Sequence, residues 1–180
     1  MELIMEKVEL TPIFDESAIK VRIAELAQHI ASDYPDGGIV FIGILKGAFV
    51  FLADLVRALE KPCHVEFVRI SSYGSSKTSS GELKILLDIA CSIEGKDVIL
   101  VDDIVDTGLT LSQYRERLLQ QKPRSLKIAA LINKTGRREK SVDLDYCGFD
   151  LDKGFLVGYG LDCDEHYRNL PCVCSIDSTH

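Results

Sequence analysis

Apolar residues follow two different spacings along the chain, and each spacing predicts a different element. Between residues 17 and 32 they recur every three or four positions, as on one face of an amphipathic helix. The turn-forming residues 34–38 end this helix, and the run 39–44 follows. That run is short, rich in β-branched residues and without polar alternation, which predicts a strand buried on both faces of a parallel sheet.

The same alternation continues through the rest of the chain. A second helix is predicted from the shared face of Ala48, Phe51, Leu52, Leu55 and Leu59, followed by a strand at 65–70. A strand at 97–101, a helix at 111–120 and a strand at 126–132 come next. Alternating strands and helices predict an α/β fold with a parallel sheet. Ligands of such sheets bind beyond the carboxyl ends of the strands, so chemistry is expected after Ile44, Val101 and Ile132.

Length and composition fit one globular domain spanning residues 1–180. The chain is 46% hydrophobic and 27% charged, and 180 residues bury enough apolar area to fold without disulfides. A net charge of -7 argues against a nucleic-acid-binding surface. The longest apolar stretch, 38–45, is too short to span a membrane, and the first residues lack the cationic head of a signal peptide. We therefore expect a cytoplasmic location.

Six cysteines are scattered without a repeated spacing, and in the cytoplasm they would stay reduced. Free cysteines behave as small hydrophobic residues, so we expect them to be buried and inert. Cys172 and Cys174 lie on one face of a predicted strand, but a metal site would need further ligands, and only His166 is near in sequence.

The most informative segment is residues 99–110, where an apolar strand runs into three carboxylates and a Thr-Gly-x-Thr turn. A helix N-terminus offers unpaired N–H groups and a positive dipole, and Gly108 allows close backbone approach. The hydroxyls of Thr107 and Thr110 add donors. This half of the segment suits a phosphate monoester.

Asp102 and Asp103 precede that phosphate cradle, where they suit the vicinal hydroxyls of a sugar. A sugar phosphate would satisfy both halves. The alternative is an ordinary helix cap, with Asp106 or Thr107 as N-cap. The sequence contains neither a P-loop nor a G-x-G-x-x-G dinucleotide motif, which removes the usual competing phosphate binders.

Residues 99–110 resemble the phosphoribosyl pyrophosphate motif of the type I phosphoribosyltransferases, and the chain from about residue 39 onward resembles the hypoxanthine phosphoribosyltransferases. The resemblance implies a central, mainly parallel sheet flanked by helices, with a small hood from the two termini and a flexible loop. It implies that phosphoribose is bound by seven residues of this segment: Asp102, Asp103, Asp106, Thr107, Gly108, Leu109 and Thr110. Asp106 would be catalytic and handle the proton at N7 of the purine. Asp102 departs from the Glu usual in the family and is shorter than it by one methylene group.

Further site residues follow from the same resemblance. Pyrophosphate would be bound by Lys46, Gly47, Ser72, Tyr73 and Arg168, with a strained non-proline peptide at Leu45-Lys46-Gly47. The purine would be bound by Lys134, Phe155, Leu156 and Asp162, where Lys134 reads the oxygen at C6 and Phe155 stacks on the base. The expected cofactor is Mg²⁺, held near Asp102, Asp103 and Asp162.

Two polar segments allow simpler interpretations. Residues 74–82 have no apolar anchor and form either a lid over the site or a solvated hairpin loop. Ser72 and Tyr73 open this segment, and the resemblance favours the lid. Residues 137–140 are interpreted as a solvated charge run rather than a nucleic-acid patch.

The predicted reaction transfers 5-phosphoribosyl from phosphoribosyl pyrophosphate to N9 of an oxopurine base, hypoxanthine and also guanine. One alternative is a regulator of the same fold that senses nucleotides without turnover, and another is an enzyme that prefers xanthine. The substrates are small molecules, and no nucleic-acid or membrane partner is expected. The family resemblance implies a homodimer or homotetramer, for which the apolar N-terminal helix offers a contact face.

Overall fold

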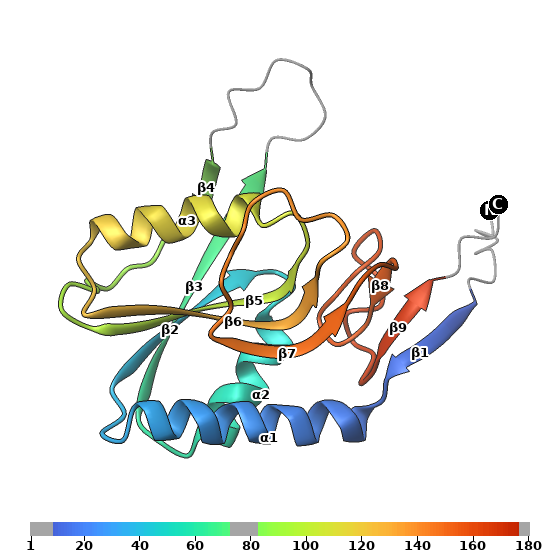
Figure 1. Cartoon of the computed structure of the whole chain (residues 1–180), viewed down its shortest axis with the longest axis horizontal. Coiled ribbons are helices and arrows are strands. Elements are labelled where there is room, and N and C mark those ends of the chain that lie inside the picture. Colours follow the sequence, from blue (N-terminus) through green and yellow to red (C-terminus); the bar gives the residue numbers. More distant parts are fainter. Residues whose placement is uncertain (1–8, 73–82, 177–180) are drawn as a thin grey trace, which may run out of the picture.

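A mixed sheet of parallel strands with one antiparallel edge forms the centre of the molecule (Figure 1). The structure is a computed structural model and describes residues 9–72 and 83–176. Within them the strand order is β4-β3-β2-β5-β6-β7, and only β3 and β4 pair antiparallel. The strands are β2 (Ile39–Leu45), β3 (Cys63–Ser72), β4 (Leu83–Leu87), β5 (Asp97–Val105), β6 (Ser125–Lys134) and β7 (Tyr146–Leu151).

Helices cover both faces of this sheet. Helices α1 (Glu16–Asp33) and α2 (Phe49–Leu59) pack on one face, and α3 (Leu109–Gln120) packs on the other (Figure 1). Helix α1 begins at Asp15, whose side chain accepts a hydrogen bond from the Ala18 N–H at 2.7 Å. Each face of the sheet has its own apolar core, and strands β2 and β5, which are buried over most of their length, separate the two cores.

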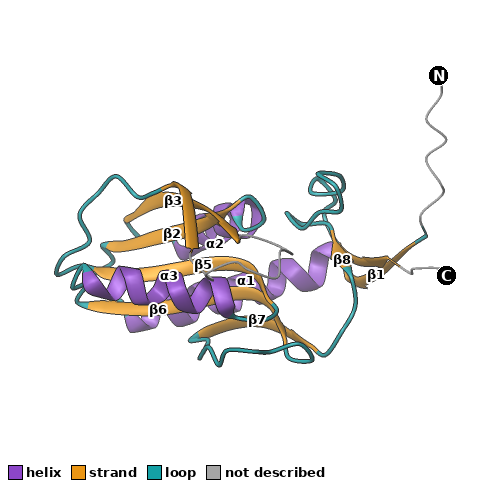
Figure 2. Ribbon diagram, turned by 90° about the horizontal axis from the view of Figure 1, so that it is seen from above, coloured by secondary structure: helices purple, strands orange, loops and turns teal. Residues whose placement is uncertain are grey.

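A second, smaller sheet forms a hood beside the main one (Figure 2). Its antiparallel strands are β1 (Leu10–Phe14), β9 (Val173–Ile176) and β8 (Leu156–Val157), in the order β1-β9-β8. Leu10 pairs with Ile176, so the first and last described strands lie side by side. The predicted hood of N- and C-terminal segments is therefore confirmed.

The predicted helices and buried strands are confirmed within a few residues. Strand β5 was predicted too short, because it continues past Val101 to Val105 and includes Asp102 and Asp103. Strands β1, β4 and β7 were not predicted. These three lie at sheet edges, where one side of the backbone ladder is open and a continuous apolar run is not required. No helix in the described ranges is both long and apolar enough to cross a membrane.

Candidate active site

The phosphate cradle lies where β5 ends and α3 begins. Gly108 is the N-cap of α3 and has a φ of +78°, in the left-handed region that favours glycine. A Cβ at this position would lie 2.5 Å from the Lys140 carbonyl oxygen. Because Gly108 itself occupies the N-cap, the alternative with Asp106 or Thr107 as N-cap is wrong. Glycine has no side chain to cap the helix, so the N–H groups of its first turn can face a ligand.

Asp102 and Asp103 form a half-buried carboxylate pair on the last part of β5. The Asp103 N–H donates to Asp102 Oδ1 at 3.0 Å. Loss of solvation, and then the charge of Asp103, raise the pKa of Asp102 well above its usual value, and loss of solvation also raises the pKa of Asp103. An adjacent cation would relieve this repulsion, so the pair fits a divalent metal on chemical grounds.

The Lys46-Gly47 loop packs directly against this pair. The peptide bond between Leu45 and Lys46 is cis, at the position where the family resemblance implies a strained non-proline peptide. A Cβ on Gly47 would lie 1.7 Å from Asp103 Oδ2, and one on Gly160 would lie 2.2 Å from the Gly47 carbonyl oxygen. Glycine at both positions therefore allows the end of β2, the end of β5 and the hood to meet at one point.

Asp106 and Lys134 form a second polar pair at the carboxyl ends of β5 and β6. Lys134 Nζ lies 3.4 Å from Asp106 Oδ2, and the lysine residue is only 8% exposed. Arg137 approaches the same oxygen at 3.6 Å. The other carboxylate oxygen, Asp106 Oδ1, is buried and has no hydrogen-bond partner. A buried acceptor without a partner is costly unless a ligand supplies a donor, so this atom indicates a binding site.

Arg138 holds this pair in place, and its role was not predicted. Its Nε donates to the Asp106 carbonyl oxygen, and its Nη2 donates to the carbonyl oxygens of Val105 and Lys134, each at 3.0 Å. Nη2 also donates to Asn133 Oδ1. The interpretation of residues 137–140 as a solvated charge run is thus wrong for Arg138, which is half-buried. Arginine offers five donors in a fixed fork, so one side chain can join several carbonyl groups, but the sequence does not show which loops lie within its reach.

The predicted base-binding residues of the hood differ in exposure. Phe155 is 54% exposed and Leu156 is 7% exposed. The Ile176 N–H donates to the Phe155 carbonyl oxygen at 3.0 Å, which fixes the backbone beside β8. The aromatic ring of Phe155 is therefore accessible to a planar ligand, while its main chain is held by β9.

Asp162 and Arg168 form the far side of the site, together with Lys46 and Glu165. Arg168 Nη2 lies 2.7 Å from Asp162 Oδ1 and 3.3 Å from Glu165 Oε2. Lys46 Nζ lies 2.8 Å from the same Glu165 oxygen. Arg168 Nη1 donates to the Gly160 carbonyl oxygen at 2.8 Å, whereas its buried Nε has no partner. Glu165 was not predicted to belong to the site.

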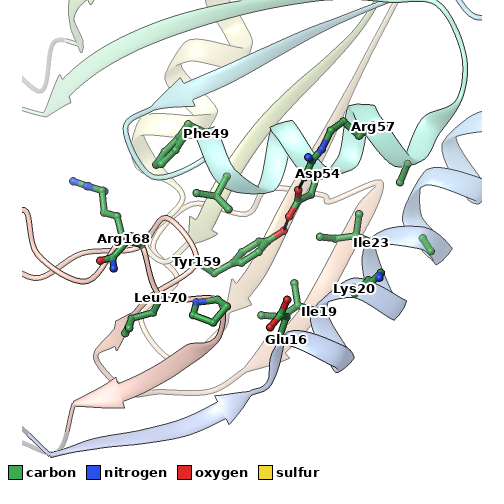
Figure 3. Close-up of a pocket in the computed structure, with 15 residues that line it drawn as sticks. Glu16, Ile19, Lys20, Ile23, Phe49, Asp54, Arg57, Tyr159, Arg168 and Leu170 are labelled. Atoms are coloured by element: carbon green, nitrogen blue, oxygen red, sulfur yellow. Dashed lines mark hydrogen bonds and ion pairs between the residues drawn. The ribbon is translucent and has the colours of Figure 1, made fainter.

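Two cavities border these residues, and the larger one is not at the predicted chemistry. A cavity of about 880 Å³ lies between α1, α2 and the hood (Figure 3), with Asp54, Tyr159 and Arg168 among its lining residues. The Tyr159 hydroxyl donates to Asp54 Oδ2 at 2.5 Å across this space. A cavity of about 250 Å³ is lined by Asp102, Asp103, Asp106 and the residues through Leu111. We assign the site to the smaller cavity because it contains the phosphate cradle and the unpartnered carboxylate oxygen.

Two further expectations concern metal binding and cysteines. The described residues contain no cluster of three or more His, Cys, Asp or Glu side chains that could hold a metal by themselves. Magnesium commonly uses one or two carboxylates together with substrate oxygens, so the Asp102-Asp103 pair remains suitable. The thiols of Cys172 and Cys174 lie 3.4 Å apart, and burial raises the pKa of Cys174 to about 11. Of the predicted pair Ser72 and Tyr73, Ser72 ends β3, whereas Tyr73 and segment 74–82 lie outside the described residues.

Comparison with known proteins decides the family. The model of the phosphoribosyl transferase domain matches residues 10–164, which include most of the residues described above. The chain belongs to the phosphoribosyltransferase family. The chain is similar to two members of the family over most of their length. A hypoxanthine-guanine phosphoribosyltransferase of Aquifex aeolicus is 48% identical over 170 residues, covering 94% of this chain and 96% of that protein. A hypoxanthine phosphoribosyltransferase of Salmonella typhimurium is 46% identical, covering 88% and 90%.

Solved structures agree with this assignment. A hypoxanthine-guanine phosphoribosyltransferase of Bacillus anthracis, 39% identical, superimposes with a TM-score of 0.88 over 96% of this chain and 100% of that chain. The hypoxanthine phosphoribosyltransferase of Trypanosoma cruzi, also 39% identical, gives a TM-score of 0.89 and covers 96% and 93%. The type I phosphoribosyltransferase fold and the family that the sequence motif predicts are both confirmed.

Proposed function

We propose that this phosphoribosyltransferase joins hypoxanthine, and also guanine, to the ribose 5-phosphate of phosphoribosyl pyrophosphate, forming the nucleotide and pyrophosphate in purine salvage. The observation that carries the choice of base is that the unpartnered oxygen Oδ1 of Asp106 and the Lys134 ammonium, which contacts the other oxygen Oδ2, belong to one polar pair. One is a buried acceptor without a donor, and the other is a nearly buried donor. An oxopurine offers the matching groups on one edge, an N7–H donor and the acceptor oxygen at C6. Adenine would place an amino donor against the ammonium.

The donor would bind across the carboxyl ends of β2 and β5. The 5-phosphate would occupy the cradle of Asp106, Thr107, Gly108, Leu109 and Thr110, and Asp102 and Asp103 would accept hydrogen bonds from the ribose hydroxyls. Lys46, Gly47 and Arg168, with Ser72 and Tyr73, would contact the pyrophosphate. When bound, Mg²⁺ supplies positive charge that stabilises the leaving group. Asp102, Asp103 and Asp162 are the residues that would hold it.

The base would be held between Phe155, the Leu156 main chain and Lys134, with its N9 directed at C1 of the ribose. As N9 bonds to C1 and pyrophosphate leaves, the positive charge of the ring is relieved by loss of the N7 proton. Asp106 is placed to accept that proton because it lines the smaller cavity and its buried Oδ1 has no competing donor.

The proposal also covers the domain organisation, location, partners and assembly of the enzyme. We propose one domain of residues 1–180, a cytoplasmic location, small-molecule substrates and no nucleic-acid or membrane partner. A homodimer or homotetramer is also proposed, and the Trypanosoma cruzi structure was determined to study how a C-terminal region affects oligomeric state. Sedimentation velocity on the full chain tests the oligomeric state directly.

An absorbance assay with phosphoribosyl pyrophosphate and magnesium tests the activity, with hypoxanthine, guanine, xanthine and adenine offered separately. Turnover of hypoxanthine, alone or with guanine, is expected, and adenine should be inactive. A preference for xanthine would reject the assigned base. No turnover with any base despite donor binding would instead support the nucleotide-sensing regulator.

A further inference from the structure

Glu165 lies between the two cations that the proposed function assigns to pyrophosphate. One of its oxygens, Oε2, lies 2.8 Å from Lys46 Nζ and 3.3 Å from Arg168 Nη2. A carboxylate that bridges a lysine and an arginine satisfies them in the same way as an oxygen of a bound phosphate does.

The backbone around Glu165 favours this position. Asp164 and Glu165 both have positive φ values, +49° and +65°, and the Glu165 N–H donates to Asp162 Oδ2 at 2.9 Å. The same Asp162 carboxylate holds Arg168 through its other oxygen at 2.7 Å. The short turn therefore keeps the Glu165 main chain near Arg168. The Glu165 side chain remains 63% exposed, so it can move away when a competing anion arrives.

We propose that Glu165 is an internal substitute for pyrophosphate: its carboxylate neutralises Lys46 and Arg168 in the free enzyme and competes with the pyrophosphate group for both. This inference rests on the proposed function, because it requires Lys46 and Arg168 to be the pyrophosphate contacts. Two consequences follow. Binding of the donor must first displace Glu165, and return of Glu165 to the two cations favours release of the pyrophosphate product.

The proposal predicts a gain of affinity when the carboxylate is removed. In the Glu165→Gln variant, the dissociation constant of magnesium pyrophosphate should fall by about 3- to 10-fold, the range expected when a partly exposed ion-pair competitor is lost. The KM for phosphoribosyl pyrophosphate should fall with it. In Glu165→Asp, whose carboxylate is retained, both values should return toward those of the unmodified protein.

Titration calorimetry with magnesium pyrophosphate on the full chain, together with steady-state kinetics, tests this. Asp164→Asn is the matched control. It removes the same charge at the residue next to Glu165, and the Asp164 side chain forms no ion pair within the described part of the chain. It should change affinity far less than Glu165→Gln. Equal effects of the two variants would indicate general electrostatics and reject a specific competitor.

Weaker or unchanged pyrophosphate binding in Glu165→Gln would also overturn the proposal, because Glu165 would then position the cations or be irrelevant to them. Failure of the proposed function gives a different result. In that case the unmodified protein neither binds magnesium pyrophosphate nor turns over an oxopurine. If the unmodified protein does both and Glu165→Gln shows no gain, only the role of Glu165 is rejected.

Discussion

Asp106 keeps a hydrogen-bonding capacity that the described part of the protein does not use. The Asp106 carboxylate shares Oδ2 with Lys134 and Arg137, while its buried Oδ1 has no partner. Burying a polar atom in this way usually costs about 1 to 3 kcal/mol, which a folded protein tolerates where a ligand later supplies the missing bond. At the scale of single residues, this unsatisfied acceptor is the clearest sign of where a base binds.

Replacement of Asp106 tests its catalytic role. Asp106→Asn keeps the shape of the side chain but cannot accept a proton, so turnover should fall roughly 100-fold to 10,000-fold, as is typical when general base help is lost. The dissociation constant of phosphoribosyl pyrophosphate should change much less. Single-turnover kinetics combined with donor titration separates the two effects, and a rate equal to that of the unmodified enzyme would exclude Asp106 as the base.

Asp102 gives a prediction about stability. The pKa of Asp102 is raised in the folded protein, so folding favours its protonated form. The contribution of Asp102 to stability is therefore greatest at low pH, and it is lost as pH rises through the folded pKa. Asp102→Asn removes that loss. The variant should therefore melt at a higher temperature than the unmodified protein at pH 7, while binding the donor more weakly.

Thermal melting from pH 7 to pH 4 checks this prediction. The advantage of Asp102→Asn should shrink as pH falls, because Asp102 itself becomes protonated in the unmodified protein. The exposed Asp143, which is far from the carboxylate pair in sequence, gives the control Asp143→Asn with a melting temperature close to normal. A lower melting temperature for Asp102→Asn at pH 7 would contradict the prediction.

Some residues of the site could be predicted from the sequence and others could not. The phosphate cradle in residues 99–110 could be predicted from the sequence, because its apolar run, its acids and its Thr-Gly-x-Thr turn are continuous in the chain. Arg138 and Glu165 could not be found in this way. Their partners lie in other loops: Arg138 reaches back to Val105, and Glu165 reaches Lys46, which is 119 residues away. Such contacts depend on the folded arrangement of loops.

At the scale of elements, the site depends on the ends of β5 and β6, which are joined by the Arg138 side chain and by hydrogen bonds of the loop backbone. Arg138 joins the end of β5 to the end of β6. The two residues after Arg138 bind the cradle: the N–H groups of Glu139 and Lys140 donate to the Thr107 carbonyl oxygen at 3.0 and 2.9 Å. Together these bonds fix the backbone of Asp106 and Lys134. The β5 and β6 loops therefore act as one rigid unit.

Arg138→Met should loosen that unit. Methionine keeps much of the side-chain volume but supplies no donors, and each buried carbonyl left without a partner costs about 1 to 3 kcal/mol. We expect turnover to fall more than tenfold (~1.4 kcal/mol or more of transition-state stabilisation) and the melting temperature to decrease. Arg115→Met, on the exposed face of α3, is the matched control. Full activity of Arg138→Met would show that the loops hold their geometry without it.

At the scale of the whole molecule, the buried central strands were predictable and the edges of the sheets were not. Continuous apolar runs such as β2 and the first part of β5 must be buried on both faces, so their position follows from composition alone. Edge strands such as β4 and β7 carry mixed patterns, and β1 finds its partner only at the other end of the chain. Pairing between such distant segments is a property of the fold rather than of local sequence.

Ion pairs that join elements across the molecule predict its response to acid. Lys127 and then Tyr146 lower the pKa of Asp33 through hydrogen bonds of 2.7 Å each, and Arg124 and Ser125 lower that of Asp97. A lowered folded pKa contributes stability above the unfolded value, near ~3.9 for Asp, and that stability is lost as pH falls through the folded pKa. The unfolding free energy should therefore decrease steeply below about pH 4.

Asp97→Asn separates this contribution from the rest. The variant should lose about 1 to 2 kcal/mol at pH 7, since Asp97 is nearly buried while Arg124 is largely exposed, and its decrease in stability with acid should be shallower. Urea unfolding at a series of pH values measures both quantities. An acid dependence equal to that of the unmodified protein would assign the loss to other carboxylates.

The pairing of β1 with β9 in the hood affects how the chain can fold during its synthesis. Strand β1 is translated before all the other described strands, but its partner β9 comes after all of them. The main sheet, with the cradle and the Lys46-Gly47 loop, is complete in the nascent chain once β7 has left the ribosome, whereas β8 and Phe155 wait for β9. A nascent chain at that stage holds the phosphate cradle but still lacks Asp162 and Arg168, and β1 remains an unpaired strand edge that needs protection until β9 is made.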